Sequence, residues 1–191
     1  MWKYEKRLQF PVNIKEPNAK MAQFIMSQYG GPDGEMGASM RYLSQRYAMP
    51  YKECKGALTD IGTEELGHLE IVAAIIHQLT RGLSAKELVD QGFGGVPFNA
   101  CEFQSKGDVI TDLHEDLAAE QKARSTYDNI LRVVRDYDVC EPIRFLRERE
   151  LVHYQRFGEL LRITQEKLDS RNFYAFNPAF DPSSLTQSSQ G

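Results

Sequence analysis

Cysteine is scarce in this sequence, and its placement excludes several classes of protein. The three cysteines, Cys54, Cys101 and Cys140, are far apart, odd in number and never part of a Cys-x-x-Cys pair. Disulfide-rich secreted domains need paired cysteines, and zinc or rubredoxin-type iron sites use Cys-x-x-Cys spacing. We therefore expect no disulfide framework and no cysteine-based metal site, and the reducing cytosol is the expected compartment of synthesis.

Long hydrophobic runs and an excess of basic charge are also missing. No segment approaches the roughly 20 apolar residues that cross a bilayer, so we expect no membrane partner. Residues 1–8 are charged and are followed by neither an apolar run nor a small-residue cleavage site, unlike a secretory signal. The net charge of −4 gives no reason to expect nucleic acid as a partner.

Histidine is rare as well, yet two of the four histidines share one spacing. Glu35 is followed thirty residues later by Glu65 and then by His68, and Glu120 is followed in the same way by Glu-x-x-His at residues 150–153. Residues three apart share a helical face, so each Glu-x-x-His pair can reach one ion. A glutamate from each of two helices plus Glu-x-x-His from the other two is the pattern of ferritin-like dimetal carboxylate proteins.

Because the pattern occurs twice, we interpret its glutamates and histidines as metal ligands rather than as ordinary surface or structural residues. A single helical glutamate is most often a solvated surface residue. Neither His77 nor His114 has a glutamate three residues before it, and for both we expect structural roles. Glu65 and Glu120 share helical faces with apolar residues, so they should point into the core. An unpaired carboxylate is costly there, and a bound metal removes that cost.

The spacing of apolar residues predicts helices over most of the chain. The expected helices cover residues 17–29, 32–49, 51–81, 107–135 and 138–168, with a minor helix at 84–91. Ser84 and Glu87 have the form of a capping box for the minor helix. Asp138 with Glu141 is expected to cap the last helix, with Pro142 in its first turn.

These elements predict an all-α fold, a ferritin-like four-helix bundle with a long crossover between bundle helices two and three. An extended segment at residues 1–16 precedes the bundle at 17–169, and residues 92–105 form the crossover. Residues 170–191 are expected to be a tail, partly mobile or in contact with another subunit. Its aromatic cluster at residues 173–180 is expected to lie against a protein surface.

The predicted donor set restricts the metal. Carboxylate oxygen with one imidazole for each ion suits manganese or iron better than structural zinc, and the lack of sulfur ligands argues against copper and iron–sulfur clusters. The spacing alone does not separate manganese from iron.

Several segments also carry a family resemblance. Gln-Tyr-Gly-Gly-Pro-Asp-Gly-Glu at residues 28–35, Thr-Glu-Glu-Leu-Gly-His at 63–68 and Arg-Glu-Leu-Val-His at 149–153 are the most specific of them. With these segments, the sequence resembles the manganese catalases, in particular their short spore-coat branch, over about residues 1–165. The order of the two histidine-containing segments makes the resemblance more specific than a single motif.

The resemblance implies a ligand for each position of the repeated pattern. Glu35 and His68 would bind the first manganese ion, Glu120 and His153 the second, and Glu65 would bridge the two. The resemblance thus implies two manganese ions per chain, with iron as the alternative.

Two further residues receive catalytic roles from the resemblance. Glu150 would not be a ligand but would sit beside the metals as a proton-transfer group. Tyr42 lies two helical turns after Glu35 on the same face and matches a tyrosine that the family places next to its ligands. A plain core tyrosine would fit that position equally well.

The function implied is disproportionation of hydrogen peroxide to water and dioxygen. The resemblance also implies a homo-oligomer, a hexamer in the larger members, and deposition in the spore coat with other coat proteins. A diiron ferritin-like oxidase or ferroxidase, in which Glu150 binds metal, is one alternative. The other is a mainly structural spore-coat protein with weak activity.

Overall fold

The chain folds into a bundle of helices in the computed structural model, which describes residues 7–90 and 104–168. No strand occurs within these residues, and no helix among them is long and apolar enough to cross a membrane. The helices are α1 (Ala19–Gly30), α2 (Glu35–Gln45), α3 (Lys52–Leu79), α4 (Ala85–Asp90), α5 (Val109–Val133) and α6 (Tyr137–Lys167).

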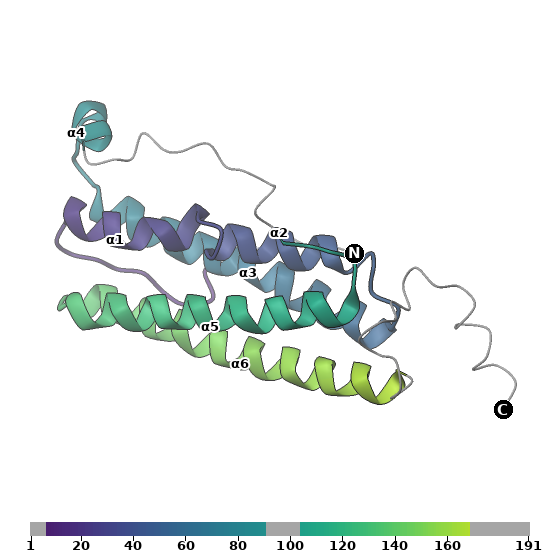
Figure 1. The fold of residues 1–191 in the computed structure, drawn as a ribbon. Coiled ribbons are helices and arrows are strands. Elements are labelled where there is room, and N and C mark those ends of the chain that lie inside the picture. The colour runs from purple at the N-terminus through teal and green to yellow at the C-terminus, as the bar shows by residue number, and fades with distance from the viewer. Residues whose placement is uncertain (1–6, 91–103, 169–191) are drawn as a thin grey trace, which may run out of the picture.

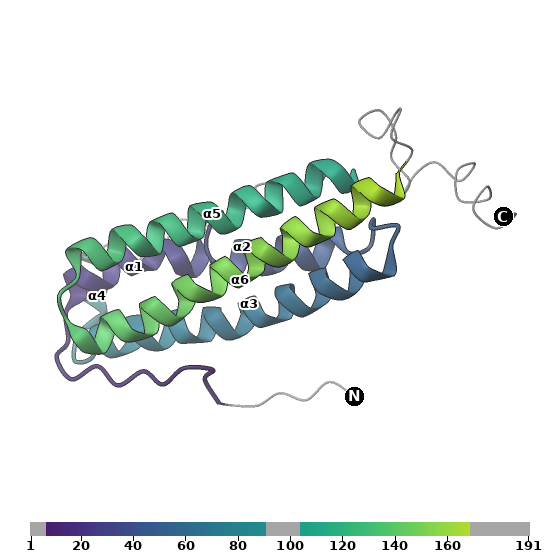
Figure 2. The same ribbon diagram turned by 90° about the horizontal axis from the view of Figure 1, so that it is seen from below.

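Four rods make up the bundle, because α1 and α2 lie end to end and together form the first rod (Figure 1). Both short helices pack against the long helix α3, and α5 packs against α6. Figure 2 shows α6 between α5 and α3, and α6 packs against both of these helices. The sequence analysis predicted both helices, at residues 17–29 and 32–49, but did not predict that they share one rod.

The break between α1 and α2 positions Glu35 at the start of a helix in the middle of the bundle. A Cβ atom on Gly34 would lie 2.6 Å from the Ser27 carbonyl oxygen, and one on Gly37 would lie 2.5 Å from that of Pro32. Only glycine fits such close approaches of backbone to backbone. As the first residue of α2, Glu35 places its carboxylate at the end of the helix that favours negative charge.

Two apolar clusters fill the bundle on either side of its middle. One includes Ile25, Ile71, Ile75 and Leu146, and the other includes Leu58, Ile61, Leu113 and Phe157. All of these side chains are buried. Burial of apolar area at about 25 cal/mol per Å² is the main force that holds the helices together. The layer between the clusters is polar and equally buried.

An extended segment, described from residue 7, runs over α3 before α1 begins. The side chain of Gln78 binds it twice, accepting from the Ile14 amide at 2.7 Å and donating to the Val12 carbonyl at 2.8 Å. Phe10 stacks on Phe145 of α6, with ring centroids 5.1 Å apart. These contacts tie the segment to two rods of the bundle.

Most helix boundaries follow the local signals of the sequence. The Ser84 and Glu87 capping box is confirmed, since the Ser84 amide donates to the Glu87 carboxylate at 2.7 Å and the Glu87 amide donates to Ser84 Oγ at 3.3 Å. The helix predicted at residues 51–81 ends at Leu79, and Gly82, three residues beyond, adopts a φ of +81°.

The predicted cap of the last helix was wrong. Asp136, not Asp138, is its N-cap, and its carboxylate accepts the Asp138 amide at 2.9 Å. Pro142 therefore lies in the second turn of α6 rather than the first. The prediction failed because Asp138 and Glu141 have the spacing of a capping box, whereas the buried residues Val139 and Cys140 show that the apolar face begins closer to Asp136.

Two predicted segments lie wholly or largely outside the described residues. These are the tail at residues 170–191 and most of the crossover at 92–105.

Candidate metal centre

The polar layer in the middle of the bundle contains all of the predicted metal ligands and Glu150. The six side chains come from four helices: Glu35 from α2, Glu65 and His68 from α3, Glu120 from α5, and Glu150 and His153 from α6. Each is at most 2% exposed. The predictions that Glu65 and Glu120 point into the core are thus confirmed, and the repeated motif converges on one point.

Glu65 lies between the two histidines. Its Oε2 is 2.7 Å from Nδ1 of His68, and its Oε1 is 2.9 Å from Nδ1 of His153. The imidazole rings lie side by side, with centroids 5.4 Å apart and planes 21° apart. One carboxylate therefore faces the same ring atom of both histidines, which is the arrangement that a bridging ligand needs.

The other two predicted carboxylate ligands divide between the histidines. Glu35 Oε2 lies 3.7 Å from Nδ1 of His68, and Glu120 Oε2 lies 3.6 Å from Nδ1 of His153. This is the pairing that the sequence analysis predicted for the two ions. The roles of these residues as ligands remain predictions.

Glu150 approaches the same group from α6. Its Oε1 is 4.0 Å from Nδ1 of His68. Potential ligand atoms of Glu65, His68, Glu150 and His153 all lie within 4.8 Å of one another. Distance alone therefore allows Glu150 to be either a ligand or a neighbour of the metals.

Crowding of buried charge shifts the pKa values of the layer. Burial, followed by the charge of Glu65, raises the pKa of Glu35 to about 7. Burial, followed by the charges of Glu35 and Glu120, raises the pKa of Glu150 well above its usual range. Burial by itself would lower the pKa of His153, but Glu65 and other carboxylates raise it to about 12. Protons thus compensate the carboxylates in the metal-free protein.

Several of these buried atoms lack a hydrogen-bond partner among the described residues, which suits a metal site. They include Glu120 Oε2 and Glu150 Oε1, together with Glu65 Oε1 and Nδ1 of His153, whose 2.9 Å contact does not have the geometry of a hydrogen bond. Buried polar atoms are normally satisfied, so a group of orphaned carboxylate and imidazole atoms facing one another calls for another partner. Oxygen donors with imidazole match manganese and iron, and the residues present therefore fit a pair of such ions.

Two tyrosines cross the bundle to the outer glutamates. The hydroxyl of Tyr42 donates to Glu120, and the hydroxyl of Tyr127 donates to Glu35. Tyr42, which the resemblance places next to the ligands, thus contacts the predicted ligand Glu120, whereas the sequence analysis gave Tyr127 no place in the site. Each tyrosine follows a glutamate by seven residues, Tyr42 after Glu35 and Tyr127 after Glu120. The repeat from which the ligands were predicted therefore also contains a signal for Tyr127.

Sequence reasoning also missed Glu64 and Arg149, because neither fits the Glu-x-x-His pattern. Glu64 lies next to both histidines, and Arg149 donates to its carboxylate. The signal available was weak: Glu64 is one turn before His68, and Arg149 directly precedes Glu150.

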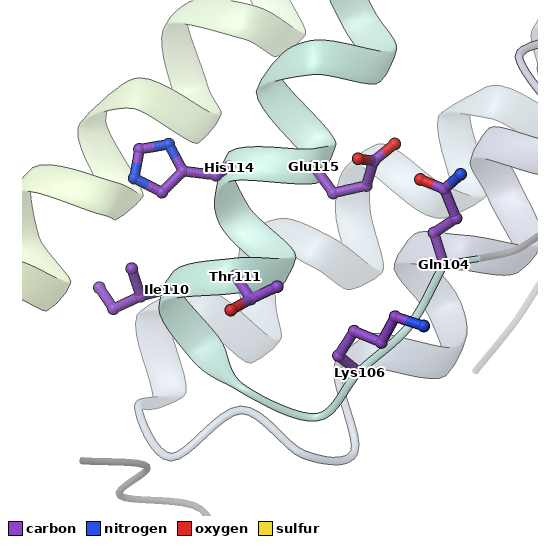
Figure 3. A pocket seen from close by; sticks show the side chains of 6 residues that line it. All are labelled: Gln104, Lys106, Ile110, Thr111, His114 and Glu115. Carbon is purple, nitrogen blue, oxygen red and sulfur yellow. The ribbon is translucent and has the colours of Figure 1, made fainter. Parts of the chain in front are cut away.

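The two remaining histidines lie outside the polar layer. His77 is exposed near the end of α3, and His114 is exposed on α5. Figure 3 shows His114 at an open hollow near the start of α5, which it lines with Lys106, Thr111 and Glu115 among others. No predicted metal ligand lines this hollow.

A further carboxylate, Asp116, is buried one turn before Glu120 and yields a stability prediction. Both of its oxygens lack a hydrogen-bond partner within the described part of the chain. Burial raises the pKa of Asp116 well above its usual range, and the nearby Gln45 amide and Arg41 guanidinium offset only part of the shift. The folded protein therefore holds this proton at pH values where the unfolded chain has released it. Its stability falls as the pH rises above the unfolded pKa of about 3.9.

Asp116→Asn should remove this penalty. The free energy of unfolding of the metal-free wild type should fall between pH 5 and pH 8, and that of the variant should fall less. The difference between variant and wild type should therefore grow by about 1 kcal/mol or more over this range. Urea unfolding of both proteins at the two pH values measures the difference. Asp60→Asn, at an exposed position, is the control and should show no such trend. If Asp116→Asn and the wild type differ in free energy of unfolding by the same amount at pH 5 and pH 8, the prediction is contradicted.

Several known proteins resemble this chain in sequence. The sequence model of the family described as manganese containing catalase matches residues 1–92 and 83–176. Protein CotJC of Bacillus subtilis (strain 168) is 44% identical over 190 residues, covering 91% of this chain and 100% of that protein. A probable manganese catalase of Clostridium acetobutylicum is 32% identical, with coverage of 91% and 85%.

Solved structures share the fold. KatB, a manganese catalase from Anabaena, superposes with a TM-score of 0.80 at 30% identity, covering 88% of this chain and 83% of KatB. A dodecameric thioferritin from Bacteroides fragilis reaches a TM-score of 0.55 at 18% identity, a likeness of fold alone. The predicted ferritin-like helical bundle is thus confirmed. Since the family model spans most of the sequence and the relatives match it nearly end to end, this chain belongs to the manganese-containing catalase family.

Proposed function

We propose that this protein is a dimanganese catalase that converts two molecules of hydrogen peroxide into two of water and one of dioxygen. The observation that carries the proposal is the position of Glu65, whose two oxygens face Nδ1 of His68 and Nδ1 of His153 at 2.7 and 2.9 Å. Membership of the family supports manganese as the metal. Two ions per chain fit the two halves of the polar layer.

In this proposal, each residue of the layer has a defined task. Glu35 and His68 hold one ion, Glu120 and His153 hold the other, and Glu65 bridges them. The bound manganese pair would supply the redox chemistry, taking two electrons from one peroxide and giving two to another. Tyr127 and Tyr42 donate to Glu35 and Glu120, respectively, and so fix the orientation of the two outer carboxylates.

Proton transfer is the task proposed for Glu150. Splitting one peroxide into two waters consumes protons, and oxidising another to dioxygen releases them, so a group beside the ions must accept and return them. A carboxyl whose pKa is raised by burial can do both near neutral pH. The apolar clusters on either side keep this proton exchange away from bulk water.

A diiron oxidase is the second candidate, and one observation favours it. One potential ligand atom of Glu150 lies within 4.8 Å of those of Glu65, His68 and His153, so Glu150 could also bind metal, as expected for a diiron enzyme. A mainly structural role with weak turnover is the third. It is disfavoured because the set of buried carboxylates and imidazoles has a cost in stability that a purely structural bundle could avoid.

The resemblance to manganese catalases also suggests where the protein acts and with which partners. We infer from it a homo-oligomer, and the thioferritin from Bacteroides fragilis, which shares the fold, is itself a dodecamer. We also infer a place in the spore coat, together with other coat proteins, after synthesis in the cytosol.

Metal analysis coupled to an oxygen electrode tests the proposal. Protein expressed with manganese should contain about two manganese ions per chain and release oxygen rapidly when peroxide is added. Protein expressed with iron should release far less. Two iron ions with oxygen consumption instead of release would assign the protein to the diiron oxidases. A well-folded, metal-free and inactive protein would favour the structural alternative.

A further inference from the structure

Glu64 lies beside both histidines, on the ring atoms that face away from Glu65. Each imidazole presents Nδ1 to Glu65 and Nε2 toward Glu64. Glu64 Oε2 hydrogen-bonds with Nε2 of His153 at 3.1 Å, and Glu64 Oε1 lies 3.5 Å from Nε2 of His68. Nε2 of His68 is buried and has no hydrogen-bond partner within the described residues, so Glu64 is the acceptor within its reach.

Arg149 holds the Glu64 carboxylate in this position from the neighbouring helix. Its Nε donates to Oε1 at 2.8 Å, and its Nη2 donates to Oε2 at 3.2 Å. Such a two-point contact fixes the plane of a carboxylate as well as its position. The side chain of Glu64 is 16% exposed and that of Arg149 is 29% exposed, so the pair forms the outer wall of the polar layer.

We propose that Glu64 is a shared positioning residue, one carboxylate that accepts the Nε2–H of both His68 and His153 and holds both Nδ1 atoms toward the metal ions. This inference rests on the proposed dimetal centre. Glu64 does not bind metal in it, and its effect on the centre acts through the two rings.

The chemistry of imidazole supports this role. A histidine that binds metal through Nδ1 keeps its proton on Nε2, and a hydrogen bond to that proton fixes both the tautomer and the ring orientation. Metal-binding histidines almost always have such an acceptor, and its removal typically weakens metal binding about 10–100-fold. Most such sites use one acceptor for each histidine. The parallel rings here leave room for one carboxylate to serve two.

The competing interpretation is that Glu64 and Arg149 form an ordinary ion pair between α3 and α6. The chain offers a matched control for it, because Glu53 and Lys167 also join these two helices, with 2.9 Å between Oε2 and Nζ. Glu53 precedes Glu64 by eleven residues on α3, which is about 16 Å along the helix. Loss of this pair removes a bond between the helices without touching either histidine.

The test is a comparison of full-length wild type, Glu64→Gln and Glu53→Gln. Each protein is stripped of metal and titrated with Mn(II) in competition with a chelating indicator. Glu64→Gln should raise the dissociation constants of both ions, each by about 10–100-fold. Glu53→Gln should leave both near their wild-type values. Circular dichroism of the metal-free proteins reports whether the variants fold.

A spectroscopic readout separates positioning from general loosening. In ¹⁵N-labelled wild type loaded with diamagnetic Zn(II), both histidines should show slowly exchanging, downfield Nε2–H signals. Glu64→Gln should move both signals upfield, and Glu53→Gln should move neither. Arg149→Lys keeps the charge but loses the two-point contact, so it should shift both signals in the same direction by less. This milder variant serves if Glu64→Gln does not fold.

Three outcomes would overturn the inference. If Glu64→Gln and Glu53→Gln bind metal with equal affinity, Glu64 is only a member of an ordinary ion pair with Arg149. If Glu64→Gln weakens the binding of only one ion and shifts only the His153 signal, Glu64 serves a single histidine. A wild-type protein that binds neither Mn(II) nor Zn(II) would contradict the proposed metal centre and this inference together, whereas the first two outcomes leave the centre intact.

Discussion

Glu65→Ala is expected to lose both metal ions and all measurable oxygen release from peroxide. Glu65 faces Nδ1 of both histidines, so under the proposed ligand assignment its removal takes a ligand from each ion at once. It also leaves two buried imidazoles without the carboxylate that compensates them, which can cost about 3–5 kcal/mol in the metal-free protein. Metal content by elemental analysis and oxygen release by electrode measure the effect.

Two further variants guard this result against simple unfolding. Glu65→Gln keeps the volume of the side chain, and it should fold while still failing to hold two ions. Glu166→Ala removes an exposed glutamate near the end of α6 and should behave as wild type. If Glu65→Gln retains two manganese ions per chain, Glu65 is not the bridge.

The bundle and its polar layer were predictable because both leave a periodic trace in the sequence. Apolar residues at helical spacing specified α3, α5 and α6 to within a few residues at either end. The Glu-x-x-His pairs then brought His68 and His153 to one place, since equal spacing on paired helices carries them to the same level of the bundle. The family resemblance separated the role of Glu150 from that of Glu65, which spacing alone does not do.

What the sequence did not reveal are contacts that depend on how the helices are rotated and packed. Glu64 and Arg149 meet across two helices, at positions 85 residues apart, and no local pattern announces such a pair. The start of α6 was misplaced because Asp138 and Glu141 match the local capping pattern, whereas the N-cap in the structure is Asp136. Tyr127 is the exception, because its spacing of seven residues from Glu120 repeats that of Tyr42 from Glu35 and was not used.

Glu150→Gln provides the sharpest distinction between the two enzymatic proposals. Glutamine keeps the shape of the side chain and removes the group that can accept and return a proton. If Glu150 transfers protons, oxygen release should fall by about 10²–10⁴-fold while two manganese ions per chain remain bound. If Glu150 binds metal instead, the variant should lose one or both ions.

The physical basis of this prediction is the position of the carboxyl group inside the layer. Burial and the charges of Glu35, Glu120 and Glu65 raise the pKa of Glu150 in the metal-free protein. Bound cations would offset part of this shift, and a carboxyl whose pKa is raised by burial can both accept and return a proton. A glutamate that only filled space would tolerate glutamine without loss of rate.

The measurement is oxygen release at saturating peroxide, with manganese content determined on the same samples. Glu148→Gln is the matched control, because it lies on the same helix two residues away and its side chain is exposed. A slow Glu150→Gln with full metal content assigns proton transfer to Glu150 and favours the dimanganese catalase. A metal-depleted variant makes Glu150 a ligand and favours the diiron set, and a variant with wild-type rate and metal content removes Glu150 from the mechanism.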